Sequence, residues 1–171
     1  MSIIRPFAGA APSIAAGAFI ADNATVIGDA SIGAGSSVWF GTVIRADSMP
    51  IRIGAHTSIQ DNSVVHVTHD VAGTVVGDRV TVGHNVILHA CTVDDDCIIG
   101  MGAIVMDRAH IGAGSIVGAG ALVTPGTRVP PGSLVVGSPA RVKRPVSAEE
   151  RAWIASSAAH YVELTERYLA G

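Results

Sequence analysis

The sequence predicts an all-β fold, a parallel β-helix in the form of a three-sided prism, followed by one C-terminal α-helix. Three observations predict this fold. Aliphatic residues recur every six positions, small residues recur four positions after them, and the composition is rich in apolar but poor in aromatic residues. Hydrophobic residues make up 49% of the 171 residues and aromatic residues only 4%. A core built from Val, Ile, Ala and Gly is expected to form thin, repeated layers.

The aliphatic residues form three series with the same period. With the single exception of Thr81, every position in these series holds Val or Ile. The period is neither the ~3.6 residues of a helix nor the ~2 residues of an amphipathic strand. It fits a short strand and a turn, and three such units would make one coil of about 18 residues. The series are Ile14, Ile20, Val26, Ile32, Val38 and Ile44; Ile53, Ile59 and Val65; and Val75, Thr81, Ile87, Val93, Ile99, Val105, Ile111, Val117, Val123, Val129 and Val135.

The residue four positions after each aliphatic one is small in most units, which lets the chain turn the corner of the prism. Cys91 and Cys97 both occupy this position, so we expect buried packing residues rather than a redox or metal role. Stacked coils would satisfy each other's backbone N–H and C=O groups at a spacing of about 4.8 Å. The chain is long enough for roughly seven such coils.

The repeat loses its phase at two places. Ile44 is followed by Ile53 rather than by residue 50, and Val65 is followed by Val75 rather than by residue 71. Extra residues in a solenoid are expected to form loops on its surface. The two predicted loops lie within residues 45–52 and 66–74.

The small position is also violated in several units. The violations are His69, Arg79, Asn85 and Pro139. Because departures from a local rule tend to collect at functional sites, the repeat itself indicates residues 45–89 as the functional region.

Four of the seven histidines fall within residues 66–89. They are His66, His69, His84 and His89. Neutral imidazole suits zinc, and a catalytic zinc keeps three protein ligands and leaves its fourth position for water. Such a site lowers the pKa of the water to about 7, which makes hydroxide available at neutral pH. The remaining histidines, His56, His110 and His160, are expected to be surface residues.

His84 and His89 are difficult to bring to one metal within one chain. They lie on consecutive units of a prism whose faces are about six residues long, so they should point away from different faces. A site between two chains of a trimer removes this difficulty, because a face of one chain meets the adjacent edge of its neighbour.

Four segments carry a resemblance to a known family. They are SSVWFGTVIRAD (36–47), IRIGAHTSIQDNSVVH (51–66), VTVGHNVILHACTV (80–93) and GSPARV (137–142). With these segments the chain resembles the γ-class carbonic anhydrases of the hexapeptide-repeat family over nearly its whole length. Generic hexapeptide acyltransferases share the repeat but lack this combination. The resemblance implies a homotrimer and a left-handed β-helix, and the handedness rests on the resemblance alone.

The resemblance also implies the residues of the metal site. It identifies His66, His84 and His89 as the zinc ligands, with His66 and His89 from one subunit and His84 from its neighbour. Gln60 matches the residue that hydrogen-bonds and positions the hydroxide, and Asp61 matches an acid of the site.

Further residues correspond to the family less directly. Arg45 and Asp47 match a pair that forms a salt bridge across the subunit interface, although a solvated surface ion pair is the alternative. Tyr161 matches a tyrosine near the site. Ser48 stands where some members carry an acid for proton transfer, and His69 is our candidate to replace it, since histidine exchanges protons near neutral pH. A purely structural role for His69 is the alternative.

The C-terminal segment does not follow the repeat. SAEE matches a capping box, with Ser147 as N-cap and Glu150 at N3, and predicts a helix that extends to Leu169. We divide the chain into a β-helix domain, residues 1–142, and a C-terminal helix packed on the prism, residues 143–171. The expected packing face of this helix comprises Ile154, Ala158, Tyr161, Thr165 and Tyr168 or Leu169.

The predicted function is zinc-dependent, reversible hydration of CO2 to bicarbonate at the subunit interface of a homotrimer. Iron and cobalt also accept three imidazoles, so the native metal stays open. Two alternatives remain. One is an acyl-CoA thioesterase or acyltransferase, although an acyltransferase of this fold would need no metal triad. The other is a metal-binding trimeric scaffold with little catalytic activity.

Several classes of partner are disfavoured by composition. The net charge is −3 and no basic run occurs, which argues against nucleic acid. Polar residues and glycines interrupt every apolar run well short of the ~18–20 residues of a membrane span. The opening segment MSIIRPFAGAAPS lacks the apolar stretch of a signal peptide, so we expect a cytoplasmic protein.

Overall fold

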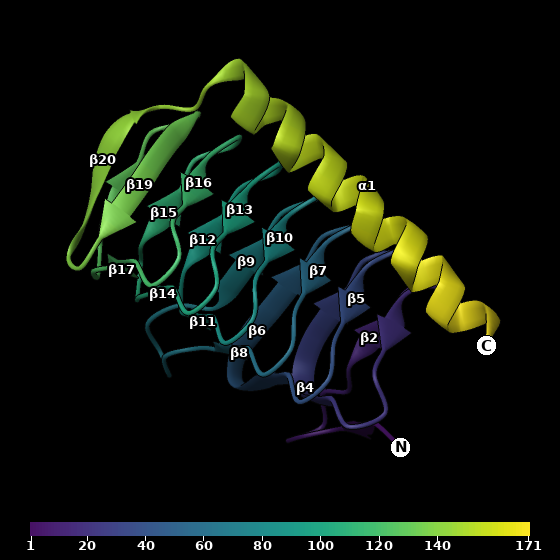
Figure 1. Cartoon of the computed structure of the whole chain (residues 1–171). Coiled ribbons are helices and arrows are strands. Elements are labelled where there is room, and N and C mark those ends of the chain that lie inside the picture. Colours follow the sequence, from purple (N-terminus) through teal and green to yellow (C-terminus); the bar gives the residue numbers. More distant parts are fainter.

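The computed structural model describes residues 1–171 and forms a β-solenoid of about seven coils with a single helix at its C-terminal end (Figure 1). Its strands are short and mostly parallel, and they pair with strands of the neighbouring coils. The predicted fold class, a parallel β-helix followed by an α-helix, is confirmed. No helix has the length and apolar character that a membrane span needs.

Three faces make up the prism. The first face contains β1 (Ile3–Arg5), β8 (Val64–His66), β11 (Ile87–His89), β14 (Ile104–Val105) and β17 (Leu122–Val123). The second contains β2 (Ser13–Ile14), β9 (Thr74–Val76), β12 (Thr92–Val93), β15 (His110–Ile111) and β18 (Arg128–Val129). β4 (Thr25–Ile32) and β6 (Val43–Ile53) run around a corner and contribute to both faces.

The third face carries the helix. Its strands are β3 (Phe19–Ile20), β5 (Ser37–Val38), β7 (Ser58–Ile59), β10 (Thr81–Val82), β13 (Ile98–Ile99), β16 (Ile116–Val117), β19 (Ser133–Gly137) and the antiparallel β20 (Ala140–Pro145). The helix α1 (Ala148–Ala170) packs across β3, β5, β7 and β10 (Figure 1).

Aliphatic side chains stacked from coil to coil fill the prism. Ile59 pairs with Val38 in the preceding coil and with Val82 in the following one, and all three are fully buried. Burial of such side chains is the main stabilising contribution, while the ladders between coils satisfy the backbone groups. Cys91 and Cys97 are buried free thiols, as predicted, and burial raises the pKa of each to about 12.

The structure corrects the predicted register in the middle of the chain. Val76, Val82 and Leu88 point into the core, whereas the predicted core residues Val75 and Ile87 are 45% and 37% exposed. Val75 and Val76 are both aliphatic, as are Ile87 and Leu88, so the six-residue pattern fits two registers equally well there. The correct register follows from the strand pairing rather than from the pattern.

This shift removes two of the apparent violations of the small position. Arg79 and Asn85 lie at exposed corners with φ angles of 55° and 56°, while Val80 and Val86 occupy the small position and are fully buried. Thr81 is likewise no exception in the core series, because it lies outside the core beneath α1. These three residues are therefore not departures from the repeat, and the repeat by itself does not mark them as part of a functional region.

The two predicted loops have different outcomes. The first, within 45–52, is instead a bulge inside the continuous strand β6. The register of β6 with β4 shifts between Gly28 and Ala30, which makes the extra residues bow out of the ladder. The second, within 66–74, is confirmed and connects β8 to β9.

The outward-facing side chains differ between the first two faces. On the first face they form a mostly apolar row, which consists of Ile3, Thr25, Val43, Val64, Ile87, Ile104 and Leu122. On the second face the corresponding row is mostly polar and consists of Ser13, Ser31, Arg52, Val75, Thr92, His110 and Arg128. Since α1 covers the third face, the first face is the one that exposes an apolar row. Exposed rows of this kind mark interaction surfaces.

The helix α1 is anchored at both ends. The predicted capping box of Ser147 and Glu150 is present, and Arg144 donates two hydrogen bonds of 2.7 and 2.8 Å to the carboxylate of Glu150. An aromatic cluster anchors the other end, and it comprises Phe19, Trp39, Phe40, Tyr161 and Tyr168. The predicted domain boundary after residue 142 falls within β20.

The corrected register can be tested with two neighbouring valines. Val76→Ala should lower the free energy of unfolding by roughly 1.5–3 kcal/mol, the value of a fully buried valine side chain. Val75→Ala should change it by less than about 0.5 kcal/mol, as surface substitutions do. Equilibrium denaturation in urea, followed by circular dichroism, measures both. A larger loss for Val75→Ala than for Val76→Ala would contradict the register.

Candidate metal site

His66 and His89 lie side by side at the ends of neighbouring strands on the first face. β8 and β11 pair in parallel with His66 opposite His89, and the centroids of the two rings are 5.4 Å apart. The residues before them, Val65 and Leu88, point into the core. The alternation of a strand therefore directs both imidazoles outward on one surface.

Each of these imidazoles is held by its Nδ1 atom. The Nδ1 of His66 lies 2.7 Å from the carbonyl oxygen of Arg45, and the Nδ1 of His89 lies 3.1 Å from a carboxylate oxygen of Asp107. Because a carbonyl oxygen and an ionised carboxylate only accept hydrogen bonds, Nδ1 is the nitrogen that carries the hydrogen. The Nε2 of each ring thus keeps a free lone pair, which is the arrangement found in metal-binding histidines.

The carboxylate of Asp107 accepts a second hydrogen bond besides the one from His89. The Thr68 hydroxyl donates to the other oxygen of the Asp107 carboxylate. This bond is the largest influence on the pKa of Asp107 and lowers it; burial opposes the change, and the bond from His89 adds to it. The carboxylate therefore stays ionised at neutral pH and fixes the orientation of the His89 ring.

His84 is held in the same way at a different place. Its Nδ1 lies 2.9 Å from a carboxylate oxygen of Asp61, so its Nε2 is free as well. His84 precedes the strand β11, at the end of which His89 lies, and the width of the first face separates the two rings. Within one chain, no three side chains of the metal-binding types come together to hold an ion.

His110 shows that a free Nε2 is not common to all histidines of the fold. Its Nε2 lies 2.9 Å from a carboxylate oxygen of Asp94, and its Nδ1 accepts from the guanidinium of Arg128 at 3.2 Å. Both ring nitrogens are thus engaged and none is left for a metal.

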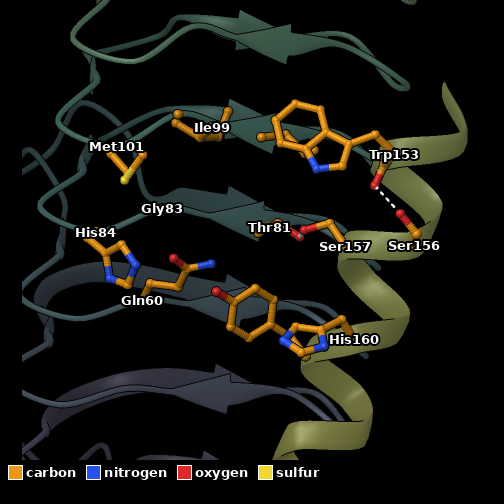
Figure 2. A pocket seen from close by; sticks show the side chains of 13 residues that line it. Gln60, Thr81, Gly83, His84, Ile99, Met101, Trp153, Ser156, Ser157 and His160 are labelled. Atoms are coloured by element: carbon orange, nitrogen blue, oxygen red, sulfur yellow. Dashed lines mark hydrogen bonds between the residues drawn. The ribbon is translucent and has the colours of Figure 1, made fainter. Parts of the chain in front are cut away.

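His84 opens onto a cavity of about 590 Å³ between the third face and α1 (Figure 2). Its lining includes Gln60, Thr81, His84, Ile99, Met101, Trp153, Ser157, His160 and Tyr161. Figure 2 shows the amide of Gln60 beside His84 and directed into this cavity. The backbone N–H of Gln60 donates to the carbonyl oxygen of Val82 in the next coil, and the hydroxyl of Thr42 in the preceding coil donates to the carbonyl oxygen of Gln60, so the backbone that carries this buried side chain is fixed.

Tyr161, a residue of α1, lines the same cavity. Its ring packs against Trp39 with centroids 6.0 Å apart. Burial raises the pKa of Tyr161, and the charge of Asp61 raises it further. The phenol therefore remains protonated at neutral pH and is a hydrogen-bond donor on the cavity wall.

Arg45 and Asp47 lie near His66. Within the chain they form an ion pair with each other in the strand β6, and the salt bridge that we predicted between subunits stays a prediction. Burial is the largest single influence on the pKa of Asp47 and raises it, but the hydrogen bond and the charge of Arg45, with smaller contributions from His66 and the backbone, together lower it. The contact of Arg45 with the candidate site is made by its carbonyl oxygen, which accepts a hydrogen bond from Nδ1 of His66.

The predicted histidine for proton transfer lies away from this cavity. The side chain of His69 is 75% exposed and lies 3.1 Å from the carboxylate of Asp70. His160, which we expected to be only a surface residue, is exposed but also lines the cavity beside Tyr161.

Asp107 and Thr68 were missed by reasoning from the sequence. Asp107 follows His89 by 18 residues, but Leu88 pairs with Val105, so this coil is one residue shorter than the regular repeat. Asp107 therefore lies one position beyond the residue that is in register with His89. Counting one regular coil would have reached Asp107, but the hydrogen bond depends on the local register and could not be read from the repeat.

Comparisons with known proteins identify the family of the chain. The chain is 48% identical to the carbonic anhydrase of Geobacillus kaustophilus over 168 residues, which cover 98% of this chain and 92% of that protein. It is 45% identical over 165 residues to gamma carbonic anhydrase 1, mitochondrial, of Arabidopsis thaliana. That match covers 94% of this chain but only 60% of the plant protein, so the chain spans less than two thirds of its length.

A family model and a solved structure complete the comparison. The bacterial transferase hexapeptide (six repeats) model matches residues 90–125. The crystal structure of a hexapeptide transferase family protein from Anaplasma phagocytophilum superposes with a TM-score of 0.93 at 46% identity, covering 97% of this chain and 98% of that chain. With these identities over nearly its whole length, the chain belongs to the γ-class carbonic anhydrase family, the enzyme family that the sequence predicted.

Proposed function

We propose that this protein catalyses the reversible hydration of CO2 to bicarbonate with a zinc ion held between two subunits of a homotrimer. His66 and His89 of one subunit and His84 of the next would bind the ion. One observation carries the proposal: all three imidazoles are fixed through Nδ1 by an oxygen acceptor and leave Nε2 free.

The donor set fits a metal ion of this kind. Three neutral imidazoles are a ligand set that catalytic zinc accepts, and oxygen acceptors at the other ring nitrogen fix the tautomer and orient the ring. Two of the three acceptors are the carboxylates of Asp61 and Asp107, whose negative charge favours a cation nearby.

The two groups of site residues suggest how subunits would meet. We call His66 and His89 the first half-site, and His84 with Gln60, Asp61 and Tyr161 the second half-site. They lie at opposite borders of the first face. If the first half-site of each chain met the second half-site of the next, the contact would be head-to-tail and a threefold rotation would close the ring. Such contacts would also bury the apolar row that the first face exposes.

The chemistry divides between the metal and the chain. Zinc in this site would supply hydroxide at neutral pH by acidifying the water at its open position. The chain's own contribution is orientation. Asp61 and Asp107 hold two of the imidazoles, and the amide of Gln60, which lies beside His84, would hydrogen-bond the nucleophile. The apolar side chains of Ile99 and Met101 on the cavity wall give CO2, which is apolar, a favourable approach.

Loss of one ligand from the second half-site should remove the metal without unfolding the chain. For His84→Ala we expect bound zinc to fall from about one ion per chain to near none, with an unchanged circular dichroism spectrum, because His84 lies outside the core. Elemental analysis and stopped-flow CO2 hydration measure this. His110→Ala, which removes a carboxylate-paired histidine elsewhere, is the control and should keep its zinc. Full zinc occupancy in His84→Ala would contradict the ligand assignment, and zinc without CO2 hydration in the unsubstituted protein would contradict the proposed activity.

The carboxylate behind His89 should tune the affinity for zinc. Asp107→Asn keeps the shape but removes the charge that fixes the ring, so the dissociation constant for zinc should rise by roughly 10–100-fold. Competition with a chelating dye measures it. Asp94→Asn alters the equivalent pair with His110 and should leave the constant unchanged. If both substitutions raised the dissociation constant for zinc equally, the effect would come from the loss of a negative charge on the protein and not from the contact of Asp107 with His89.

A further inference from the structure

We infer that His160 carries protons between the proposed site and bulk solvent. This inference rests on the proposed function. Hydration converts CO2 and water into bicarbonate and one proton, and that proton must leave the site before the next turnover. In the proposed step, it passes from water in the site to a free nitrogen of the His160 imidazole, and then from the imidazolium to buffer.

The position of His160 connects the two environments. It lies on α1 and lines the same cavity as His84 and Gln60 (Figure 2), while its own side chain is exposed to solvent. Tyr161 lines this cavity as well. The centroid of its ring lies 5.4 Å from that of Tyr161. A proton taken up on the cavity side can therefore be released on the solvent side.

The ring of His160 is also free to exchange a proton. No hydrogen bond or ion pair within the chain engages it, whereas His110 is held at both ring nitrogens. Trp153, Ser156 and Ser157, its neighbours on α1 that line the cavity, carry no charge, and the titratable groups there are Tyr161 and His84. Imidazole is the side chain that takes up and releases protons near neutral pH.

His69, the residue that the sequence suggested for this role, is the competing candidate. It lies in the segment that connects β8 to β9, close to the first half-site in sequence, but its imidazole already pairs with Asp70. It does not line the cavity into which Gln60 points. The two candidates therefore predict opposite effects on proton transfer when His160 or His69 is removed.

Exchange of ¹⁸O between CO2 and water on the zinc-loaded protein separates the two steps. It reports the interconversion of CO2 and bicarbonate, and independently the release of labelled water, which requires a proton. His160→Ala should slow water release by roughly tenfold or more, leave the interconversion within about twofold, and recover when imidazole is added. His69→Ala should change neither rate. His56→Ala removes an exposed histidine from the opposite side of α1 and is the matched control.

A second measurement does not depend on activity. In protein labelled with ¹⁵N-histidine, the ring N–H signals of His160, assigned by their loss in His160→Ala, should exchange rapidly with water, whereas those of His110, which is held at both ring nitrogens, should exchange slowly. Slow exchange of the His160 ring N–H with water would overturn the inference. So would unchanged water release in His160→Ala, or its loss in His69→Ala instead. Absence of interconversion in the unsubstituted, zinc-loaded protein would refute the proposed function, and the inference would fall with it.

Discussion

The hydrogen-bonded register between successive coils is the constraint on which the site depends. It places His89 directly on His66, and it also supplies the acceptor that holds each imidazole. In every case the acceptor belongs to a neighbouring coil, at separations of 21, 18 and 23 residues. The pairs are Arg45 with His66, Asp107 with His89 and Asp61 with His84. The same stacking that satisfies the backbone therefore holds all three imidazoles through Nδ1 and leaves their Nε2 atoms free.

The three faces of the prism have separate roles because their outward side chains differ. The third face is covered by α1, which brings Tyr161 and His160 to the cavity. The second face presents a polar row to solvent. The first face exposes an apolar row and carries a half-site at each border, so the surface suited to a partner is also the surface where the histidines lie.

Much of the fold could be predicted because the period of six is incompatible with a helix or an ordinary strand. The register in the middle of the chain could not, since aliphatic pairs such as Ile87 and Leu88 fit two phases, and only the pairing of strands decides between them. The bulge within β6 was predicted as a loop, because a gap in the six-residue pattern gives the number of extra residues but not their conformation.

The sequence allowed three candidate ligands to be named, but the residues around them were harder to predict. Counting units predicted that one chain could not bring His84 and His89 to one metal, and within the chain no three metal-binding side chains come together. The carboxylate of Asp107 lies one coil away, and the choice between His69 and His160 depends on how α1 docks on the third face. Docking is set by side-chain packing such as the aromatic cluster around Trp39, which the repeat does not encode.

Mixing two inactive variants tests most directly whether the metal site is shared between subunits. His84→Ala and His89→Ala chains, dissociated and reassembled in equal amounts, should regain about a quarter of the zinc of the unsubstituted trimer. Each mixed trimer then holds one intact site in a closed ring of three. A mixture of His66→Ala and His89→Ala should regain none, because both defects lie in the same half-site. Zinc at this level in the first mixture and none in the second is the predicted result; no recovery in the first mixture, or equal recovery in both, would contradict a site shared between neighbouring chains.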